Sequence, residues 1–256
     1  MNISEMFSLS GKTAIVTGAG KKTGLCLGMA QALNKAGAKV ALWDVLPDVH
    51  ALCEELGGAK AGYYSAQADL RNYEAAERAF AQAAQLLGGR VDILLNGAGL
   101  QHRDDAVDFP PEKWELIIDV NLTGLFHMSQ IAGKHMIEKG GGKIINIASA
   151  TSFAASRRIC AYSASKGGVM QLTKALSNEW ASLGVNVNAI APGYMETELT
   201  ADMMKTDIGK MHTTRIPMGR WGKPEDLHGA VVFLASSASN YVSGAIIPVD
   251  GGYLGA

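Results

Sequence analysis

Short apolar runs alternate with longer amphipathic segments along the whole chain. Seven of these runs read as strands: residues 13–18, 39–44, 61–67, 91–99, 142–149, 185–193 and 243–252. Their Val, Ile and Leu content is continuous rather than alternating, which is typical of strands buried on both faces of a parallel sheet. The pattern therefore favours an α/β fold over a sandwich or a helical bundle.

The segments between these runs carry helical spacing and helix-end signals. Residues 23–37 end at a glycine, residues 47–56 begin at a proline, and residues 73–89 end in two glycines. Two longer helices are expected near residues 111–138 and 161–184. The order predicts one Rossmann-type domain over residues 1–256, a doubly wound seven-stranded parallel sheet with helices on both faces.

One region, residues 194–223, departs from this regularity. Its hydrophobic period is weak, it holds several Met and Thr residues, and it follows Pro192 and Gly193. We expect a substrate lid there, with an ordinary surface loop as the alternative.

Composition narrows the setting of the protein. The chain has 256 residues and a formal net charge of −1, so nothing draws it broadly to nucleic acid or anionic lipid. Its three cysteines are too few for a disulfide framework and favour a reducing compartment. The first residues lack a signal-peptide pattern, and no apolar stretch reaches about 18 residues. We expect a cytoplasmic protein with no membrane or nucleic-acid partner and no metal site.

The glycine-containing loop of residues 16–28, VTGAGKKTGLCLG, is the first candidate for chemistry. It does not match the G-x-x-x-x-G-K-[ST] spacing of an ATP-binding loop. It does leave a strand and open a helix, where backbone N–H groups and the helix dipole favour a pyrophosphate. Asp44 closes the second strand about twenty residues later and can accept hydrogen bonds from ribose hydroxyls.

These features predict a dinucleotide site, and Asp44 favours NAD because its carboxylate would repel the 2′-phosphate of NADP. Lys21 and Lys22 point the other way, since a lysine in this loop could meet that phosphate. Two solvated lysines are the alternative, and we weigh Asp44 more heavily.

Several short motifs, taken in order, resemble the short-chain dehydrogenase/reductase family over essentially the whole chain. They are TGAGKKTG, DL at residues 69–70, NGAG at 96–99, the Asn of DVNLTG, the Ser of INIAS, YSASK at 162–166, PGYMET at 192–197 and VDGG at 249–252. Two departures stand out. Lys22 replaces the middle glycine of the first motif, and Gly97 replaces the second Asn of the family's N-N-A-G.

The resemblance implies a set of coenzyme contacts. It comprises Gly18, Gly20, Lys22, Thr23, Gly24, Asp44, Asp69, Leu70, Asn96, Gly97, Ala98, Tyr162, Lys166, Pro192, Gly193 and Thr197. Within it, Asp69 and Leu70 are expected near the adenine, and Thr197 near the nicotinamide carboxamide. Asp69 as a helix cap and Thr197 as a cap of the lid are the alternatives.

The candidate catalytic residues are Asn121, Ser149, Tyr162 and Lys166. Tyr162 and Lys166 lie four residues apart and share a helix face. An ammonium beside a phenol lowers its pKa, so Tyr162 is expected to exchange a proton with an alcohol or carbonyl. The resemblance further implies that Lys166 holds the nicotinamide ribose, Ser149 orients the substrate oxygen and Asn121 relays protons through water.

The substrate is expected to be a small molecule held by loops at the carboxyl ends of strands. His102, Arg103, Arg157 and Arg158 lie in two such loops, and arginine pairs bidentately with carboxylates. The predicted substrate-binding residues are His102, Arg103 and Arg158, together with Ser149 and Tyr162. Subunit contacts or solvent exposure are the alternative roles for the arginines.

The resemblance narrows to the sugar-acid branch, the gluconate and 2-dehydro-3-deoxy-D-gluconate 5-dehydrogenases, through segments such as RIPMGRWGKPEDL. A 3-oxoacyl-thioester reductase, another secondary-alcohol dehydrogenase and an NAD-sensing scaffold are the alternatives. The two long helices carry more apolar residues than a sheet would cover, which indicates oligomerisation. The family implies a homotetramer.

Overall fold

Seven parallel strands form one sheet in the computed structural model, which describes residues 2–197 and 200–256. The strands are β1 (Thr13–Thr17), β2 (Lys39–Asp44), β3 (Tyr63–Gln67), β4 (Ile93–Asn96), β5 (Gly142–Ile147), β6 (Val185–Pro192) and β7 (Ile246–Val249). Their order is β3-β2-β1-β4-β5-β6-β7, and every neighbouring pair is parallel. The predicted doubly wound parallel sheet is confirmed.

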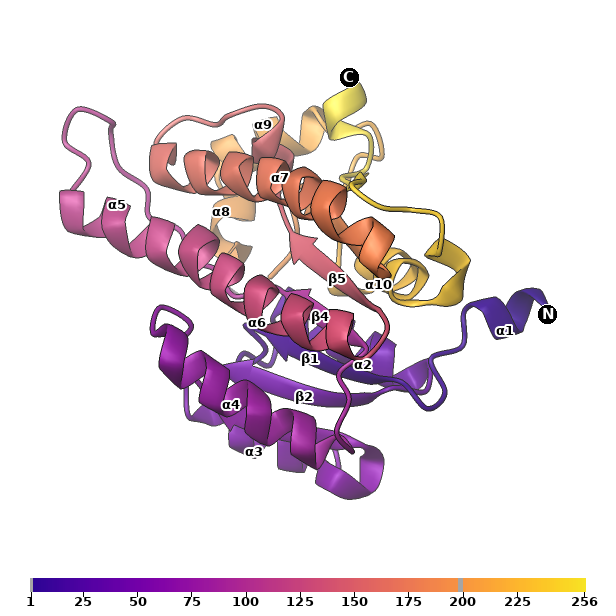
Figure 1. The fold of residues 1–256 in the computed structure, drawn as a ribbon. Helices are drawn as coiled ribbons and strands as arrows, with labels where there is room; N and C mark the ends of the chain where they lie inside the picture. Colours follow the sequence, from indigo (N-terminus) through magenta and orange to yellow (C-terminus); the bar gives the residue numbers. More distant parts are fainter. Residues whose placement is uncertain (1, 198–199) are drawn as a thin grey trace.

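Helices cover both faces of this sheet. The helices α2 (Leu25–Lys35), α3 (Asp48–Glu55) and α10 (His228–Ala235) share one apolar core. On the other face lie α4 (Tyr73–Leu86), α6 (Gly124–Glu138) and α7 (Cys160–Trp180), side by side in Figure 1. Alternate residues of each strand enter the two cores, which is why the strands read as continuously apolar.

The long helix expected near residues 111–138 is interrupted. It consists of α5 (Pro111–Ile118), a π-helical stretch at Asp119–Thr123, and α6. Such widened turns recur at functional sites because they displace one side chain from the regular helical path. The fully buried Asn121 lies within this one.

The lid region is more regular than its sequence predicts. It contains two helices, α8 (Ala201–Lys205) and α9 (Asp207–Thr214). The remaining short helix, α1 (Ile3–Met6), lies near the amino terminus. The hydrophobic period is weak because α8 buries no side chain and α9 buries only Gly209. Two residues of the predicted lid, 198 and 199, lie outside the described residues.

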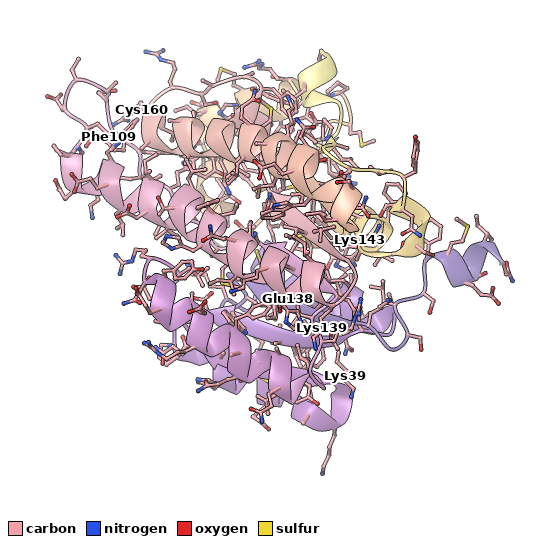
Figure 2. The ribbon with its side chains drawn as sticks, in the orientation of Figure 1. Lys39, Phe109, Glu138, Lys139, Lys143 and Cys160 are labelled. Carbon is pink, nitrogen blue, oxygen red and sulfur yellow. The ribbon has the colours of Figure 1, made fainter. Side chains whose placement is uncertain are left out.

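The loops that follow the strands lie at one end of the sheet. Between the neighbours β1 and β4 the strand order reverses direction, so their loops lead to opposite sides. Figure 2 shows Phe109 and Cys160 at this end, whereas Lys39 and Lys143, at the amino ends of β2 and β5, lie at the opposite end. Ligands of open α/β sheets bind at the carboxyl ends beside such a switch point. Among the described helices, none is both long and apolar enough to cross a bilayer.

Candidate active site

The loop after β1 is built for close backbone approach. Gly18 has a φ of +76°, and a Cβ there would lie 2.7 Å from the Cα of Ala98. A Cβ on Gly20 would lie 2.6 Å from Cγ of Asp44. Gly24 forms the N-cap of α2 without a side-chain cap, so the first turn offers its backbone N–H groups to an anion. These residues fit a dinucleotide pyrophosphate.

Asp44 is held by the backbone on two sides. The N–H of Gly20 donates to Oδ2 at 2.8 Å, and the N–H of Leu46 donates to Oδ1 at 3.0 Å. The carboxylate therefore stays fixed at the carboxyl end of β2, where the ribose is expected. A 2′-phosphate bound at this point would meet a fixed negative charge.

Lys22, the residue in place of the family's middle glycine, turns away toward α3. Its Nζ pairs with Oε2 of Glu55 at 2.7 Å, and the lysine side chain is 74% exposed. The backbone of the loop makes a tight turn, with the N–H of Gly24 donating to the carbonyl of Lys21 at 2.9 Å. The structure thus places the Lys22 charge in an exposed ion pair.

Asp69 and Leu70, the residues expected near the adenine, both form hydrogen bonds within the protein. The guanidinium of Arg71 binds both carboxylate oxygens of Asp69, at 2.6 to 3.1 Å, which holds the pKa of Asp69 below its usual range. Leu70 is buried, and its carbonyl lies 3.0 Å from Nδ1 of His127. Backbone atoms and the Asp69–Arg71 pair are therefore what this strand end presents.

Asn96 lies in a buried polar network under the site. Its Nδ2 donates to the Ser129 hydroxyl at 2.9 Å and to Oδ1 of Asn146 at 3.0 Å. Asn146 in turn donates to the Thr173 hydroxyl at 3.0 Å. The network ties β4 and β5 to α6 and α7, and it positions the glycine-containing turn that follows Asn96.

Gly97 has a packing reason in this chain. A Cβ on it would overlap the Sγ of Cys26, which lies 3.4 Å from the Gly97 carbonyl. The hydroxyl of Thr17 accepts from the N–H groups of Gly97, at 3.0 Å, and of Ala98, at 3.2 Å. A buried thiol thus occupies the space that a side chain at position 97 would need, and burial raises the pKa of this thiol to about 12.

We predict that Gly97→Ala lowers the free energy of unfolding by about 1–3 kcal/mol, because overpacking forces the loop to shift. Cys26→Ala removes the overlapping sulfur, so the double variant should be less destabilised than Gly97→Ala alone. Urea unfolding of the three variants measures this. Equal destabilisation of Gly97→Ala and the double variant would show that the thiol is not the obstacle.

The four candidate catalytic residues come from three elements. Ser149 follows β5, and its hydroxyl accepts from the N–H of Thr151 at 3.1 Å. Tyr162 and Lys166 lie on α7, with Nζ of Lys166 at 5.8 Å from the Tyr162 ring centroid. Lys166 is only 3% exposed, and its Nζ donates to the carbonyl of Ile147 at 2.6 Å.

Asn121 is bound to the loop after β4. Its Oδ1 accepts from the N–H of Leu100 at 2.8 Å, and its Nδ2 donates to the Leu100 carbonyl at 2.9 Å and to the Ser165 hydroxyl at 3.1 Å. A Cβ on Gly99 would lie 3.3 Å from Oδ1 of Asn121 and 3.6 Å from Nζ of Lys166. The side chain of Asn121 therefore fixes this loop beside the buried lysine.

The protonation states differ from the simplest expectation. Burial raises the pKa of Tyr162, while the adjacent Ser149 hydroxyl opposes that rise. Burial also lowers the pKa of Lys166 to about 8. Desolvation of the phenol therefore sets the direction for Tyr162 in the chain alone, and the lowering of its pKa by Lys166 stays a prediction.

Two of the predicted substrate residues are engaged with neighbouring acids. Arg158 has a φ of +65°, and its Nε lies 3.2 Å from Oδ1 of Asp105. Nε2 of His102 lies 3.8 Å from Oδ2 of Asp104. The N–H of Asp104 also donates to the Arg158 carbonyl at 3.0 Å, so the two loops are joined.

Arg103 differs from these two residues. It makes no ion pair with any residue in the described ranges, 2–197 and 200–256. Its charge acts on two residues of the lid region: burial raises the pKa of Tyr194 and Arg103 opposes that rise, whereas burial lowers the pKa of His212 and Arg103 lowers it further. Of the two arginines selected for the substrate, Arg158 is paired with an acid, whereas Arg103 has no acidic partner among the described residues.

The carboxyl end of β6 packs tightly against the end of β7. A Cβ on Gly193, which follows Pro192, would lie 2.7 Å from the Cα of Asp250. The N–H of Thr197 donates to the Thr200 hydroxyl at 2.9 Å, and the two hydroxyls lie 3.1 Å apart. These bonds join Thr197 to Thr200, and both predicted roles of Thr197, the contact to the carboxamide and the cap of the lid, stay predictions.

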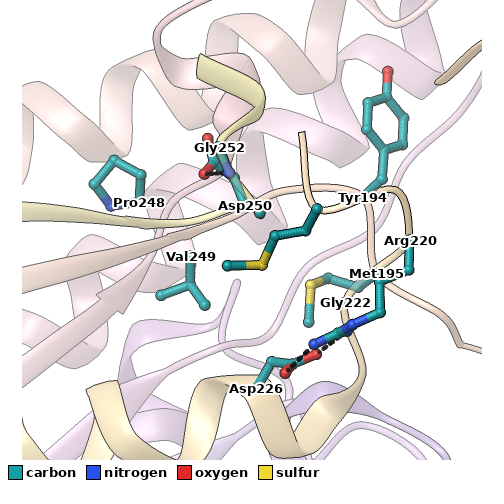
Figure 3. Close-up of a pocket in the computed structure, with 11 residues that line it drawn as sticks. Tyr194, Met195, Arg220, Gly222, Asp226, Pro248, Val249, Asp250 and Gly252 are labelled. Atoms are coloured by element: carbon teal, nitrogen blue, oxygen red, sulfur yellow. Dashed lines mark hydrogen bonds and ion pairs between the residues drawn. The ribbon is translucent and has the colours of Figure 1, made fainter. Parts of the chain in front are cut away.

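A cavity of about 390 Å³ lies between the lid and the last strand. Figure 3 shows Met195 and the Arg220–Asp226 ion pair on its wall, with distances of 2.7 and 2.9 Å between guanidinium and carboxylate. None of the four candidate catalytic residues lines this cavity. Its wall is made by residues of the lid and of the last strand, Tyr194 among them.

Comparison with known proteins places this geometry in a family. A family model described as enoyl-(acyl carrier protein) reductase matches residues 18–254. The chain belongs to the short-chain dehydrogenase/reductase family. Members are oxidoreductases that act on CH–OH groups of small molecules with a nicotinamide nucleotide, and the predicted resemblance is confirmed.

Curated relatives and solved structures extend the match over nearly the full chain. A 2-dehydro-3-deoxy-D-gluconate 5-dehydrogenase of Bacillus subtilis is 46% identical, over 98% of this chain and 97% of the relative. An NAD-dependent glycerol dehydrogenase of Listeria innocua is 36% identical, over 96% and 95%. A gluconate 5-dehydrogenase from Burkholderia cenocepacia, solved with NADP and tartrate, has a TM-score of 0.94 and 36% identity, with 100% of each chain covered.

The structure also shows residues at the site that the sequence does not predict. Gly99 lies against Asn121 and Lys166, although it is part of the NGAG motif. The Ser152 hydroxyl donates to the Lys166 carbonyl at 2.7 Å. In the sequence, Tyr194 is visible only as part of PGYMET, and His212 belongs to no motif. A partner in space, rather than a signal in sequence, identifies each of these residues.

Proposed function

We propose that this protein is an NAD-dependent dehydrogenase that interconverts a secondary alcohol and a ketone of a sugar acid, of the gluconate or 2-dehydro-3-deoxygluconate type. One observation carries the proposal: Tyr162 lies beside Ser149 and the buried Lys166, at the sheet end where Asp44 closes the dinucleotide loop. The sugar-acid names of close relatives support the substrate class.

In the proposed reaction the alcohol loses a hydride from carbon and a proton from oxygen. Bound NAD supplies the acceptor for the hydride. Ser149 orients the reacting oxygen, and Tyr162 exchanges the proton with it. Because burial raises the pKa of Tyr162, the phenol holds its proton at neutral pH and can give it to a carbonyl. In the oxidation direction the Lys166 ammonium stabilises the phenolate.

The other residues position this group. Asn121 fixes Leu100 and the loop around Gly99, and Lys166 is oriented by its bond to the Ile147 carbonyl. The glycines at positions 18, 20 and 24 receive the pyrophosphate, and Asp44 receives the ribose hydroxyls. NAD is preferred because the two backbone bonds of Asp44 prevent the carboxylate from turning away from a 2′-phosphate.

We further propose that the chain acts as one domain with residues 194–223 as its lid, and that it assembles as a homotetramer. Trp114 on α5 is 42% exposed and Phe126 on α6 is 37% exposed. Exposed rings on these long helices support contact with a second copy.

The test is a panel of sugar acids, the matching neutral polyols and 3-oxoacyl thioesters, assayed through the absorbance of the reduced coenzyme. We expect turnover of gluconate-type acids with NAD, and a KM raised tenfold or more by Arg103→Gln, because a charge-assisted contact to the carboxylate is lost. Equal kcat/KM on acids and polyols, or preferential reduction of thioesters, would overturn the sugar-acid assignment.

A further inference from the structure

The lid carries an aromatic cluster that joins it to the end of the chain. The ring of Tyr194 stacks on His212, with centroids 4.1 Å apart and planes 25° apart. It also lies 5.1 Å from the ring of Trp221 and 5.3 Å from that of Tyr253. Ile216, Trp221 and Tyr253 are buried beneath this contact. Helix α9 is therefore fastened to the body of the protein through Tyr194 and His212.

One polar atom of the stacked Tyr194–His212 pair has no hydrogen-bond partner among the described residues. The Tyr194 hydroxyl lies 3.3 Å from Nε2 of His212. Nδ1 of His212 is buried and has no partner within the described part of the chain. If the phenol donates to Nε2, the imidazole proton must reside on Nδ1, which leaves a buried N–H donor without an acceptor. A buried donor in this state costs free energy unless a ligand satisfies it.

Positive charge surrounds this donor. Arg103 approaches from the loop after β4, and Arg215 follows α9, its Cζ 4.9 Å from the centroid of the Tyr253 ring. Burial lowers the pKa of His212, and both arginines lower it further. Together with the Tyr194 hydroxyl, these are the charged and titratable groups that act on the imidazole, and neither arginine forms an ion pair with a described residue.

The cluster also reaches the segment between Ser149 and Tyr162, because Ala150 packs within it. Ser156 belongs to the segment between Ser149 and Tyr162, and its hydroxyl adjoins the Tyr194 phenol. Tyr194 also lines the cavity between the lid and the last strand, and Figure 3 shows its phenol directed away from the Arg220–Asp226 pair on that wall. The phenol is also close to His212 of the lid and to Tyr253 near the end of the chain, and the charge of Arg103 acts on it from the loop predicted to grip substrate.

We propose that His212, held by Tyr194, acts with Arg103 as a receptor for the carboxylate of the substrate, so that an acidic substrate fastens the lid over the site. This specificity role rests on the proposed function for its substrate class. The carboxylate would satisfy Nδ1 of His212 and counter the positive charge of Arg103. A neutral polyol would leave both groups unsatisfied, so the lid itself discriminates acids from polyols.

His212→Phe tests this inference, because it keeps an aromatic ring against Tyr194 and removes both nitrogens. Tartrate, a hydroxylated dicarboxylate that does not need to react, is titrated calorimetrically into the protein saturated with NADH. Kinetics with a sugar acid and with the matching polyol are measured in parallel. We expect the Kd of tartrate and the KM of the acid to rise about tenfold, while kcat and the polyol kinetics stay unchanged.

Two further variants sharpen the result. Tyr194→Phe removes only the hydroxyl that fixes the imidazole, and it should weaken tartrate binding in the same direction. Lys210→Gln is the matched control, since it removes a positive charge from α9 that is exposed and paired with Asp207 at 3.2 Å. It should leave the Kd of tartrate unchanged.

The outcomes separate this inference from the proposed function. If tartrate binding depends on His212 but no sugar acid is turned over, the receptor stands and the sugar-acid activity fails. If wild-type protein binds no tartrate, or if His212→Phe weakens acids and polyols equally, the receptor is overturned and His212 is a packing residue of the lid.

Discussion

Tyr162→Phe is expected to lower kcat by about 10²- to 10⁴-fold, the usual contribution of one positioned proton-transfer group. The substitution removes a single oxygen and keeps the ring that packs beside Lys166. The dinucleotide loop and Asp44 are untouched, so the Kd of NADH should change far less than kcat, although Tyr162 is one of the implied coenzyme contacts. Initial rates with a sugar acid, together with NADH binding followed by fluorescence, measure the two effects.

Tyr241→Phe is the control for this variant, because its side chain is fully exposed and far from the loops of the site. It should retain wild-type kinetics. A Tyr162→Phe enzyme with kcat within tenfold of wild type would mean that another group carries the proton. Loss of NADH binding in the same variant would mean that Tyr162 acts through the coenzyme instead.

A second large effect is expected for the coenzyme. Wild-type protein should use NAD at least about a hundredfold more efficiently than NADP, since like charges brought together cost several kcal/mol. Asp44 accepts two backbone N–H groups and cannot turn away without breaking both bonds. Asp44→Ser should raise kcat/KM for NADP and lower it for NAD, as measured by initial rates at varied coenzyme.

Asp48→Ser serves as the matched control, because it removes an exposed acid from the first turn of α3 without touching the ribose site. It should leave the coenzyme preference unchanged. The Listeria relative is named as NAD-dependent and the Burkholderia relative was solved with NADP, so both coenzymes occur among the relatives. Equal use of both coenzymes by wild type would show that Lys22 or another cation outweighs Asp44.

The fold was predictable because its signal is local and repeated. Each strand is a continuous apolar run, and each helix has an end signal such as Gly37. The hydrophobic period does not reveal the π-helical stretch at Asp119–Thr123, because the spacing on both sides of it is that of an ordinary helix. Its reason is the pair of bonds between Asn121 and Leu100, which are 21 residues apart.

The sequence predicts which residues form the candidate site, but it does not predict which groups these residues bind in the folded protein. Tyr162 and Lys166 share a face, as their spacing predicts, yet the Lys166 ammonium binds the Ile147 carbonyl and burial dominates the pKa of the phenol. Arg158 and Arg103 read alike in sequence. Only the structure shows that Asp105 pairs with Arg158 and that Arg103 faces the lid.

Residues with no motif are the ones that sequence alone could not place. His212 gains its meaning from a ring stacked on Tyr194 and a buried nitrogen without a partner, and both depend on the folded lid. Gly97 reads as a departure from the family until Cys26 is found in the vacated space. In both cases a contact distant in sequence carries the information.

The central claim, that Tyr162 exchanges the proton of the reacting oxygen, is tested most directly by a crystal structure of the protein with NADH and a sugar acid. The decisive measurement is the distance from the Tyr162 hydroxyl to the reacting oxygen. The account predicts hydrogen-bond reach, about 2.6–3.2 Å, with the Ser149 hydroxyl on the same oxygen. A phenol well beyond that reach, with the oxygen held by other residues, would contradict it.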